Sequence, residues 1–415
     1  MRGAADKPES VLVIGAGIAG LTIAHQLSRQ GIRVTVCDGV GVGAGASWGN
    51  AGWVNPIQAG PMPEPQVVLD SVRHLGSGQS STKIAMRDIP GLAGWLLAFL
   101  RNCTPARYRR AAGWLAELGR TSVADVEQLA EDGVVFTHRR GELLAVARDP
   151  RLVDAFLAAR KPLCTSGLRL PSTVLTGSEL RDLEPILSSR ITAGVRVEDH
   201  LDIDSASLLR GLSDHLRDRG VIIAEGVTAT EVRAVDGRAD AVVTDQGDYR
   251  SDAVVVATGA IPNPLYRGFP MIGARGYSFD VAARRRPGRS VLLLGSHIAC
   301  VPRDGRVRIA GGVDFGPSAR LSSARLDAMV ALAEPSLVGV DWGDRRNEWT
   351  GQRPVTPDGL PVVDRLPPYS NVFVATGYAT LGMTLAASIA VLVARWIVEG
   401  ERAPVLAPFR VDRFR

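Results

Sequence analysis

Near its start the chain carries three glycines at a spacing that lets a backbone turn hold a diphosphate. The apolar run Ser10–Ile14, rich in β-branched residues, ends at the first glycine and leads directly into the helical stretch Leu21–Gln30. In such a G-x-G-x-x-G turn the glycines allow a tight bend, close approach of a pyrophosphate and close packing of helix on strand. The positive end of the helix would face the phosphates. The turn therefore predicts a dinucleotide site made of Gly15, Gly17, Ile18, Ala19 and Gly20.

A carboxylate follows at the distance expected for a group that binds ribose hydroxyls. The second predicted strand, Arg33–Asp38, ends in Asp38, eighteen positions after Gly20. In dinucleotide-binding units the acidic residue that contacts the ribose comes about 20 positions after the last glycine. Strand, helix, second strand and terminal Asp all agree. A glycine-rich turn without a ligand is therefore the weaker interpretation.

Three later segments have the small residues that let a ligand approach the backbone closely. The loop Ser47–Trp53 combines small residues with one Asn and two Trp, which suggests backbone lying against something flat. A generic glycine-rich loop explains that segment equally well. The apolar strand Ala253–Ala257 runs into Thr258-Gly259-Ala260, a second candidate ligand turn. A third turn, Thr376–Thr384, joins a strand to the last long helix, whose N-terminus could face an electron-rich group.

Composition excludes several function classes. The chain has 415 residues, 46% of them hydrophobic and 22% charged, as is usual for a globular protein with a large core. The net charge is only +5, and the arginines are scattered without a nucleic-acid-binding motif. The cysteines are too far apart for a zinc site or a disulfide framework, which predicts a reducing compartment. They are Cys37, Cys103, Cys164 and Cys300.

Location follows from the apolar segments. Met1–Glu9 has no apolar core of a signal peptide, so we expect a cytoplasmic protein. The most apolar stretch, Ala379–Ala394, ends at Arg395 short of the ~18 residues that a membrane span needs, and it predicts a buried helix. The apolar segment Leu92–Asn102, with several arginines after it, predicts either a membrane-surface anchor or, as the favoured alternative, a core helix.

The remaining elements are read from periodicity and turn residues. Leu115–Ala130 predicts one helix, and Gly133–Val146 predicts a β-hairpin. Ser205–Gly220 predicts an amphipathic helix with its leucines on one face. Trp349–Pro361 is a rigid proline-rich loop that holds one cation, Arg353.

Together these motifs resemble a known family. They are similar to those of the FAD-dependent amine and D-amino-acid oxidoreductases, which include glycine oxidase, sarcosine oxidase and, most similar, bacterial D-amino-acid dehydrogenase (small subunit type). The resemblance covers nearly the whole chain. Beyond the first glycine turn, it is carried by Ser47–Gly52 (family S-x-x-N-A-G), Leu97–Tyr108, Asp202–Leu209, Arg275-Gly-Tyr-Ser278, Gly351–Pro361 (family G-x-R-P-x-T-P-D-G-x-P) and Gly377–Thr384.

The resemblance implies a cofactor and roles for particular residues. It implies non-covalent FAD, with Asp38 at the adenosine ribose and the Val227 backbone at the adenine. It implies that Arg353 anchors the substrate carboxylate, and a planar guanidinium suits that task because it forms two parallel hydrogen bonds. The alternative for Arg353 is an ion pair with Asp358 that stabilises the loop. The residues that would line the isoalloxazine are Asn50, Ala51, Gly52, Leu381, Gly382, Met383 and Thr384. Further candidates for binding the cofactor are Ser47, Thr258, Gly259 and Gly377.

Two tyrosines complete the candidate site. Tyr277 could hydrogen-bond the substrate, and a half-buried core tyrosine is an equally good interpretation. The family turn G-H-G-x-x-G is here Gly377–Gly382, so that Tyr378 stands in place of a His and Ala379 in place of a Gly. Asp364 also replaces a glycine of the family pattern. Tyr378 therefore either reshapes the substrate pocket or fills core space, and the change puts the usual substrate in doubt.

We therefore expect an α/β fold with two domains. A discontinuous Rossmann-like FAD-binding domain would take residues 1–60, 190–260 and 350–415, and an antiparallel-sheet α+β substrate domain residues 61–189 and 261–349. The expected reaction is oxidation of a carboxylate-bearing amine, a D-amino acid or related secondary amino acid. Hydride passes from Cα to flavin N5 and the resulting imine hydrolyses, with oxygen, a quinone or another carrier as the final acceptor. The alternatives are an FAD-dependent 2-hydroxy-acid dehydrogenase and a non-catalytic flavoprotein subunit. A peripheral contact at the inner face of the cell membrane is a further expectation.

Overall fold

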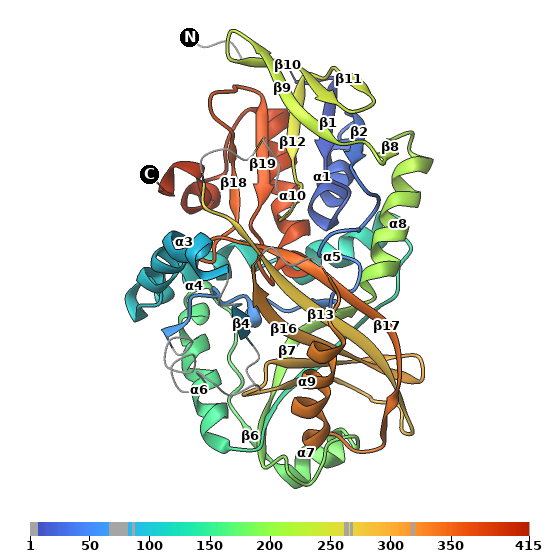
Figure 1. Cartoon of the computed structure of the whole chain (residues 1–415), viewed down its shortest axis with the longest axis vertical. Coiled ribbons are helices and arrows are strands. Elements are labelled where there is room, and N and C mark those ends of the chain that lie inside the picture. The colour runs from blue at the N-terminus through green and yellow to red at the C-terminus, as the bar shows by residue number, and fades with distance from the viewer. Residues whose placement is uncertain are drawn as a thin grey trace.

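The molecule is built around two sheets that lie one above the other along its long axis (Figure 1). The computed structural model describes residues 7–65, 82–84, 88–260, 265, 269–316 and 320–414. The upper sheet has six strands and the lower sheet has ten, and strands β13 (Ile272–Ala283) and β17 (Val340–Val355) of the lower sheet run across the middle of the view. This architecture confirms the predicted α/β fold, with a Rossmann-like parallel sheet and a second, largely antiparallel sheet.

The six-stranded sheet carries the first glycine turn. Its strand order is β18-β19-β12-β1-β2-β8, and all neighbours are parallel except β18 and β19. Because helices or strands cover both faces, the inner strands read as continuous apolar runs. The strands are β1 (Ser10–Ile14), β2 (Arg33–Asp38), β8 (Ile222–Glu225), β12 (Ala253–Val256), β18 (Val362–Arg365) and β19 (Val372–Thr376).

Alternate residues of β1 pack on opposite faces of this sheet. Val11 and Val13 contact the core formed with helices α1 (Ile18–Arg29), α8 (Ser205–Asp218) and α10 (Gly382–Glu399). Leu12 and Ile14 pack into the opposite core, which the small sheet of β9, β10 and β11 covers. The bounds of that small sheet are Ala229–Val235, Arg238–Thr244 and Gly247–Tyr249.

The ten-stranded sheet has the path β17-β13-β16-β15-β14-β5-β7-β3, with β4 beside β16 and β6 beside β7. Most of its pairs are antiparallel, and β17 lies at an edge. The remaining strands are β3 (Trp53–Val54), β4 (Thr82–Ile84), β5 (His138–Ala147), β6 (Val174–Thr176), β7 (Ala193–Ile203), β14 (Ser290–Leu293), β15 (Ile298–Arg303) and β16 (Arg306–Phe315).

Three predictions of secondary structure were wrong. The loop predicted over Trp349–Pro361 begins as strand, because its residues up to Val355 belong to β17 and pair with β13. The hairpin predicted over 133–146 is instead the single strand β5, and Gly141 marks a shift in its register with β7 rather than a turn. The helix predicted over 115–130 is divided between α4 (Pro105–Gly119) and α5 (Ser122–Glu131). The other helices outside the upper core are α3 (Ile89–Asn102), α6 (Pro150–Arg160), α7 (Gly177–Leu183) and α9 (Ser323–Ala333).

The last helix, α10, is the buried helix that the sequence predicted. It is long and apolar enough to cross a bilayer, the only such helix in the described part of the chain, yet 67% of it is buried inside the protein. It packs against α1, and the Thr22 hydroxyl donates to the carbonyl of Ala386 at 3.3 Å. These contacts make α10 part of the core of the upper half.

Two strands from the ranges predicted for the FAD-binding domain belong to the other sheet. β3 and β7 lie within ranges predicted for the FAD-binding domain but pair in the ten-stranded sheet. The exact domain limits stay a prediction.

Asp364, a departure from the family pattern, has a structural role. Its carboxylate accepts a hydrogen bond from the Val411 N–H at 2.9 Å and lies 3.5 Å from Arg402. It thus holds the C-terminal segment against β18.

Candidate active site

Most of the predicted site residues meet in one cavity. The cavity has a volume of about 430 Å³ and is walled by the carboxyl ends of β1, β2 and β12 on one side and by β13 and β17 on the other. Crevices at the carboxyl ends of parallel strands are the usual ligand sites of such sheets. The predicted residues in its wall are Gly15, Gly17, Ile18, Ala19, Asp38, Ser47, Asn50, Val227, Thr258, Gly259, Arg353, Tyr378, Gly382 and Met383.

The first turn can be formed only with glycine at two positions. Gly15 has φ +111°, and a Cβ there would lie 2.5 Å from the carbonyl oxygen of Ala257. A Cβ on Gly20 would lie 1.8 Å from the Gly15 carbonyl oxygen, so its absence lets α1 begin directly beneath the strand. The Ser47 hydroxyl accepts the Ile18 N–H at 3.2 Å. The turn thus presents the positive end of a 12-residue helix to the cavity, as a diphosphate requires.

Asp38 fixes the turn from the adjacent strand. One carboxylate oxygen accepts the Ala16 N–H at 2.8 Å, and the other accepts the N–H groups of Val40 and Gly41, each at 2.9 Å. A carboxylate has about four lone-pair sites, so these bonds leave acceptor capacity toward the cavity. The position and chemistry of Asp38 fit the predicted ribose contact.

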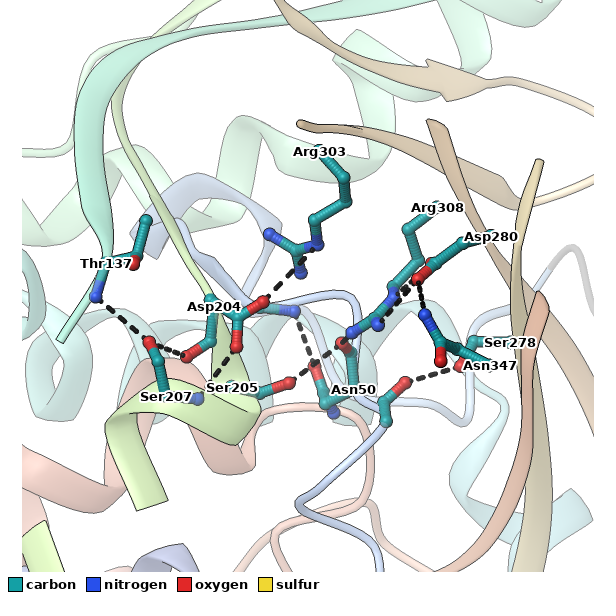
Figure 2. Close-up of polar contacts among 12 residues, drawn as sticks. Asn50, Thr137, Asp204, Ser205, Ser207, Ser278, Asp280, Arg303, Arg308 and Asn347 are labelled. Carbon is teal, nitrogen blue, oxygen red and sulfur yellow. Dashed lines mark hydrogen bonds and ion pairs between the residues drawn. The ribbon is translucent and has the colours of Figure 1, made fainter. Parts of the chain in front are cut away.

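The loop Ser47–Gly52 is clamped by hydrogen bonds to its backbone (Figure 2). The Ser278 hydroxyl donates to the Gly49 carbonyl at 2.7 Å, and the Ser205 hydroxyl donates to the Asn50 carbonyl at 3.1 Å. Gly49 also lies beneath the Trp349 ring, which a Cβ would approach to 2.2 Å. Since β13 and the start of α8 supply these donors, both halves of the molecule position the loop.

A buried ion pair supports this clamp. Arg308 on β16 donates to both carboxylate oxygens of Asp280 at 2.8 and 3.2 Å, and it reaches the Asn50 carbonyl at 3.4 Å (Figure 2). Asn347 donates to the same carboxylate at 2.8 Å. Asn50 itself accepts the Gly52 N–H through its side-chain oxygen at 3.0 Å. The loop is therefore a rigid wall of the cavity, although its contact with a flavin stays a prediction.

Arg353 has the environment of an anion-binding group. Its guanidinium lies directly over Gly276, where a Cβ would come within 2.1 Å, and Nη1 donates to the Gly312 carbonyl at 3.0 Å. Burial lowers the pKa of Arg353 to about 10, although the nearby Asp314 carboxylate acts to raise it. Within the described residues no carboxylate forms an ion pair with this guanidinium. The nearby carboxylate of Asp314 pairs with Arg325 instead, at 2.8 Å.

The alternative role of Arg353 is excluded by the same geometry. Asp358, its predicted partner in a structural ion pair, binds Arg413 at 2.7 Å instead. The side chain of Asp358 also accepts the Leu360 N–H at 3.2 Å, which fixes the proline-rich loop. Arg353 is therefore left to face the cavity.

The two tyrosines have different positions. Tyr277 is buried in the core between β13 and α9, its hydroxyl donates to Asp314 at 2.9 Å, and it does not line the cavity. Burial and the Asp314 charge raise the pKa of Tyr277 to about 12. The predicted substrate contact of Tyr277 gains no support from this placement. Tyr378 lines the cavity and is 5% exposed, and the next residue, Ala379, has φ +47°, a conformation that favours the glycine it replaces.

Some predicted residues shape the turns without reaching the cavity. Thr384 accepts the Asn55 N–H at 3.3 Å and donates to the Trp53 carbonyl at 3.2 Å, which ties α10 to β3. Gly52 has φ +78° and allows the Ile203 carbonyl within 1.9 Å of a would-be Cβ. The predicted cofactor residues outside the wall are Gly20, Ala51, Gly52, Gly377, Leu381 and Thr384.

The wall also contains residues to which sequence reasoning gave no role. Arg275 stood in a family motif, but nothing in its neighbours indicated where its side chain lies. The sequence likewise did not indicate where the side chains of Thr350 and Gln352, on either side of Gly351, lie. The main residues missed are Ala44, Gly45, Ala46, Thr228, Arg275, Thr350, Gly351, Gln352 and Pro354.

Comparison with known proteins gives a consistent picture. The model of the family DAO, FAD dependent oxidoreductase, matches residues 10–396. The D-amino acid dehydrogenase of Cereibacter sphaeroides (strain ATCC 17029 / ATH 2.4.9) is 32% identical over 421 residues, which cover 97% of this chain and 95% of the relative. The glycine oxidase structure from Bacillus cereus ATCC 14579 has a TM-score of 0.74 at 19% identity and covers 97% of this chain and 98% of its own. The iminodiacetate oxidase structure from Chelativorans sp. BNC1 has a TM-score of 0.72 at 20% identity, with coverages of 96% and 98%.

Proposed function

We propose, from the premise that this chain belongs to the DAO family of FAD-dependent oxidoreductases, that it oxidises the C–N bond of an amine that carries a carboxylate. The substrate would be a D-amino acid or a related secondary amino acid, as the names of the relatives suggest. The products would be an imine and, after hydrolysis, a keto acid with ammonia or an amine. The observation that carries the proposal is Arg353, a guanidinium in the cavity wall without a carboxylate partner among the described residues.

FAD is the cofactor of this family, and the cavity fits it. The glycine turn at residues 15–20 would take the diphosphate without covalent attachment, Asp38 the ribose and the loop Ser47–Asn50 the flavin. The bound flavin supplies the hydride acceptor, at N5, for the substrate Cα–H. The Cβ-free surfaces of Gly15 and Gly20 support this assignment because any side chain there would push the helix away from the strand.

The residues of the chain would orient the substrate rather than move protons. Arg353 would bind the carboxylate through two parallel hydrogen bonds and so fix the direction of Cα–H. The described wall contains no His or Glu, and burial raises the pKa of the wall thiol Cys37 to about 12. A neutral amine keeps a lone pair to support hydride loss, so no side-chain base is needed.

The need for a side-chain base separates amines from 2-hydroxy acids. An alcohol loses hydride readily only when a base removes its hydroxyl proton, and Asp38, the one carboxylate of the described wall, is assigned to the ribose rather than to the substrate. We therefore place the 2-hydroxy-acid dehydrogenase second and the non-catalytic subunit third. The test is a panel of D-amino acids, N-substituted amino acids and 2-hydroxy acids, assayed for product with an artificial electron acceptor. Turnover of only the hydroxy acids would reject the amine assignment, and turnover of none would favour the non-catalytic subunit.

Location and electron acceptor belong to the same proposal. We infer a cytoplasmic protein that touches the inner face of the cell membrane through α3, where Ile89, Leu97 and Leu100 are 42%, 50% and 51% exposed. Exposed arginines on α3 and α4 would meet anionic lipid headgroups. These are Arg101, Arg107, Arg109 and Arg110.

The membrane contact and the acceptor have separate tests. The double variant Leu97→Glu/Leu100→Glu should lose flotation with vesicles of anionic lipid and keep its activity with a soluble acceptor. A membrane contact would favour a quinone as acceptor, whereas efficient turnover with oxygen alone would favour an oxidase. Equal flotation of wild type and variant would reject the α3 surface as the contact.

A further inference from the structure

A second cavity lies between helix α4 and the C-terminal segment, which are neighbours in Figure 1. Its volume is about 450 Å³, close to the 430 Å³ of the cofactor cavity, and the two cavities share none of the residues that the structure describes. One wall is α4, the opposite wall comes from residues 407–413, and Pro61, Pro63 and Asp358 lie between them. This cavity has no part in the amine oxidation proposed above.

One face of α4 turns toward this cavity. Its lining residues Arg107, Arg110, Ala111 and Trp114 follow one another at steps of three, one and three positions. Side chains that are three, four or seven positions apart share one face of a helix. Trp114 is 37% exposed, so its indole offers the cavity a flat apolar surface. The wall thus combines two guanidinium groups with an aromatic ring.

The carboxylates of the cavity wall already have partners on the C-terminal segment. Asp358 binds Arg413 at 2.7 Å, and Asp412 forms an ion pair with Arg410. The described wall contains no other carboxylate. Its acidic groups therefore neutralise the arginines of the C-terminal segment and not those of α4.

The two arginines of α4 keep their positive charge uncompensated. Arg107 donates to the neutral side chain of Asn102 at 3.3 Å, and among the described residues neither Arg107 nor Arg110 has a carboxylate partner. Like charges three positions apart on a helix are neighbours and repel each other. The two guanidinium groups therefore leave room for an anion that interacts with both.

The position of these arginines on α4 adds to the same effect. Arg107 lies in the first turn, where the positive end of the helix disfavours a cation, and this turn, all of it described, has no acidic residue. An anion held by Arg107 and Arg110 would offset both the mutual repulsion and the unfavourable helix end. Charge and geometry thus point to the same ligand class.

We propose that this cavity binds a phosphate group, with Arg107 and Arg110 on its oxygens and Trp114 against any organic part of the ligand. Guanidinium groups bind carboxylates and phosphates through paired hydrogen bonds. A carboxylate has one charge and two oxygens, whereas a phosphate monoester has close to two charges and three acceptor oxygens. The phosphate therefore suits two uncompensated guanidinium groups better than a carboxylate does.

Two sources carry this chemistry: inorganic phosphate and the phosphomonoester headgroup of an anionic lipid. The position of the cavity favours the lipid, because Asn102, the last residue of α3, lines it. Leu97 and Leu100 on α3 are 50% and 51% exposed and would meet the acyl chains. Only the lipid source rests on the membrane contact proposed for α3, and the phosphate site itself does not.

The test is isothermal titration calorimetry of the FAD-loaded protein with inorganic phosphate and with monomeric dihexanoylphosphatidic acid. We expect saturable binding at one site per chain. Arg107→Gln/Arg110→Gln should weaken binding at least tenfold, because it removes charge-assisted hydrogen bonds, and Arg107→Lys/Arg110→Lys should lose less. Tighter binding of the lipid than of inorganic phosphate, lost in Trp114→Ala, would identify the headgroup as the source. Equal or weaker binding of the lipid would identify free phosphate.

A matched control removes the same charge from outside the cavity. Arg101→Gln/Arg109→Gln changes two exposed arginines of α3 and α4 that do not line it, and its affinity for both probes should stay within twofold of wild type. Thermal unfolding gives a second readout, since a ligand that binds only the folded state raises Tm. The probe should raise the Tm of wild type and of the control, but not that of Arg107→Gln/Arg110→Gln.

Three results would overturn the proposal. They are the absence of saturable binding with both probes, equal weakening in the two double glutamine variants, and binding of acetate as tight as that of phosphate. Leu97→Glu/Leu100→Glu should keep the binding of inorganic phosphate while it loses flotation, so failure of the membrane contact is seen separately. None of these readouts needs an amine substrate, so the result is independent of the proposed reaction.

Discussion

Replacing Arg353 by Met is expected to stabilise the substrate-free protein and to destroy substrate binding. Burial lowers the pKa of the guanidinium from 12.5 to about 10, so the folded state holds this charge less favourably than the unfolded chain does. A shift of this size costs the folded state roughly 3 kcal/mol at pH 7, and the cost falls away only as pH rises from about 10 toward 12.5. Met avoids that cost and gives up the hydrogen bond to the Gly312 carbonyl, worth about 1 kcal/mol. The free energy of unfolding should therefore rise by about 2 kcal/mol.

Substrate binding should change in the opposite direction. Two charge-assisted hydrogen bonds to a carboxylate contribute about 1.5–3 kcal/mol each, so kcat/KM should fall by roughly 10²–10⁴. Arg353→Lys keeps the charge without the planar pair of donors and should lose roughly 10- to 100-fold. Urea unfolding at pH 7, FAD content and steady-state kinetics measure the three quantities. A less stable Met variant with an unchanged KM would show that Arg353 is structural and would refute the reasoning.

Three further substitutions test the walls of the cavity. Gly20→Ala should abolish FAD retention, because its Cβ would meet the Gly15 carbonyl oxygen at 1.8 Å, whereas Gly94→Ala in α3, with open space around it, should leave FAD content unchanged. Ala379→Gly should raise the free energy of unfolding by about 0.5–1 kcal/mol, because it relieves the left-handed conformation at φ +47°; a destabilised variant in urea titration would contradict this. Tyr378→His should reorder the substrate ranking by kcat/KM at constant FAD content, with Tyr378→Phe as its control. If both variants keep the wild-type ranking, Tyr378 fills core space only.

The glycine turn could be predicted because its physics is local. The order strand, glycine, helix fixes where the phosphate-binding N–H groups point, and Gly15 and Gly20 are required by contacts within that unit or with the next parallel strand. Arg353 was predicted in a rigid proline-rich loop, but it lies in strand β17, paired with Ala274 of β13, a partner that the local sequence does not reveal. The comparisons confirm the family and the fold that these motifs predicted.

The predictions that were wrong or missing depend on contacts between residues that lie far apart in the sequence. Residues 134–136 and 141–146 were predicted as the two strands of a hairpin, yet β5 runs from His138 through Gly141 as one strand. Its pairing partner is β7, about 60 residues later, which absorbs the irregularity at Gly141 as a register shift. The cavity beside Arg107 and Arg110 was not predicted, because its opposite wall comes from the C-terminal segment, far along the chain. The clamp from Ser278 to Gly49 likewise joins residues 229 positions apart.

The central claim, that the flavin takes hydride from Cα of a carboxylate-bearing amine, is tested most directly by anaerobic stopped-flow spectroscopy. The purified protein should be yellow, and a D-amino acid should bleach its absorbance at about 450 nm, an expectation from flavin chemistry. Deuterium at Cα should slow that bleaching several-fold, and the matching amine without a carboxylate should reduce the flavin at least 100-fold more slowly, as loss of the Arg353 contact requires. Bleaching by 2-hydroxy acids but by no amino acid, or equal rates with and without the carboxylate, would contradict the account.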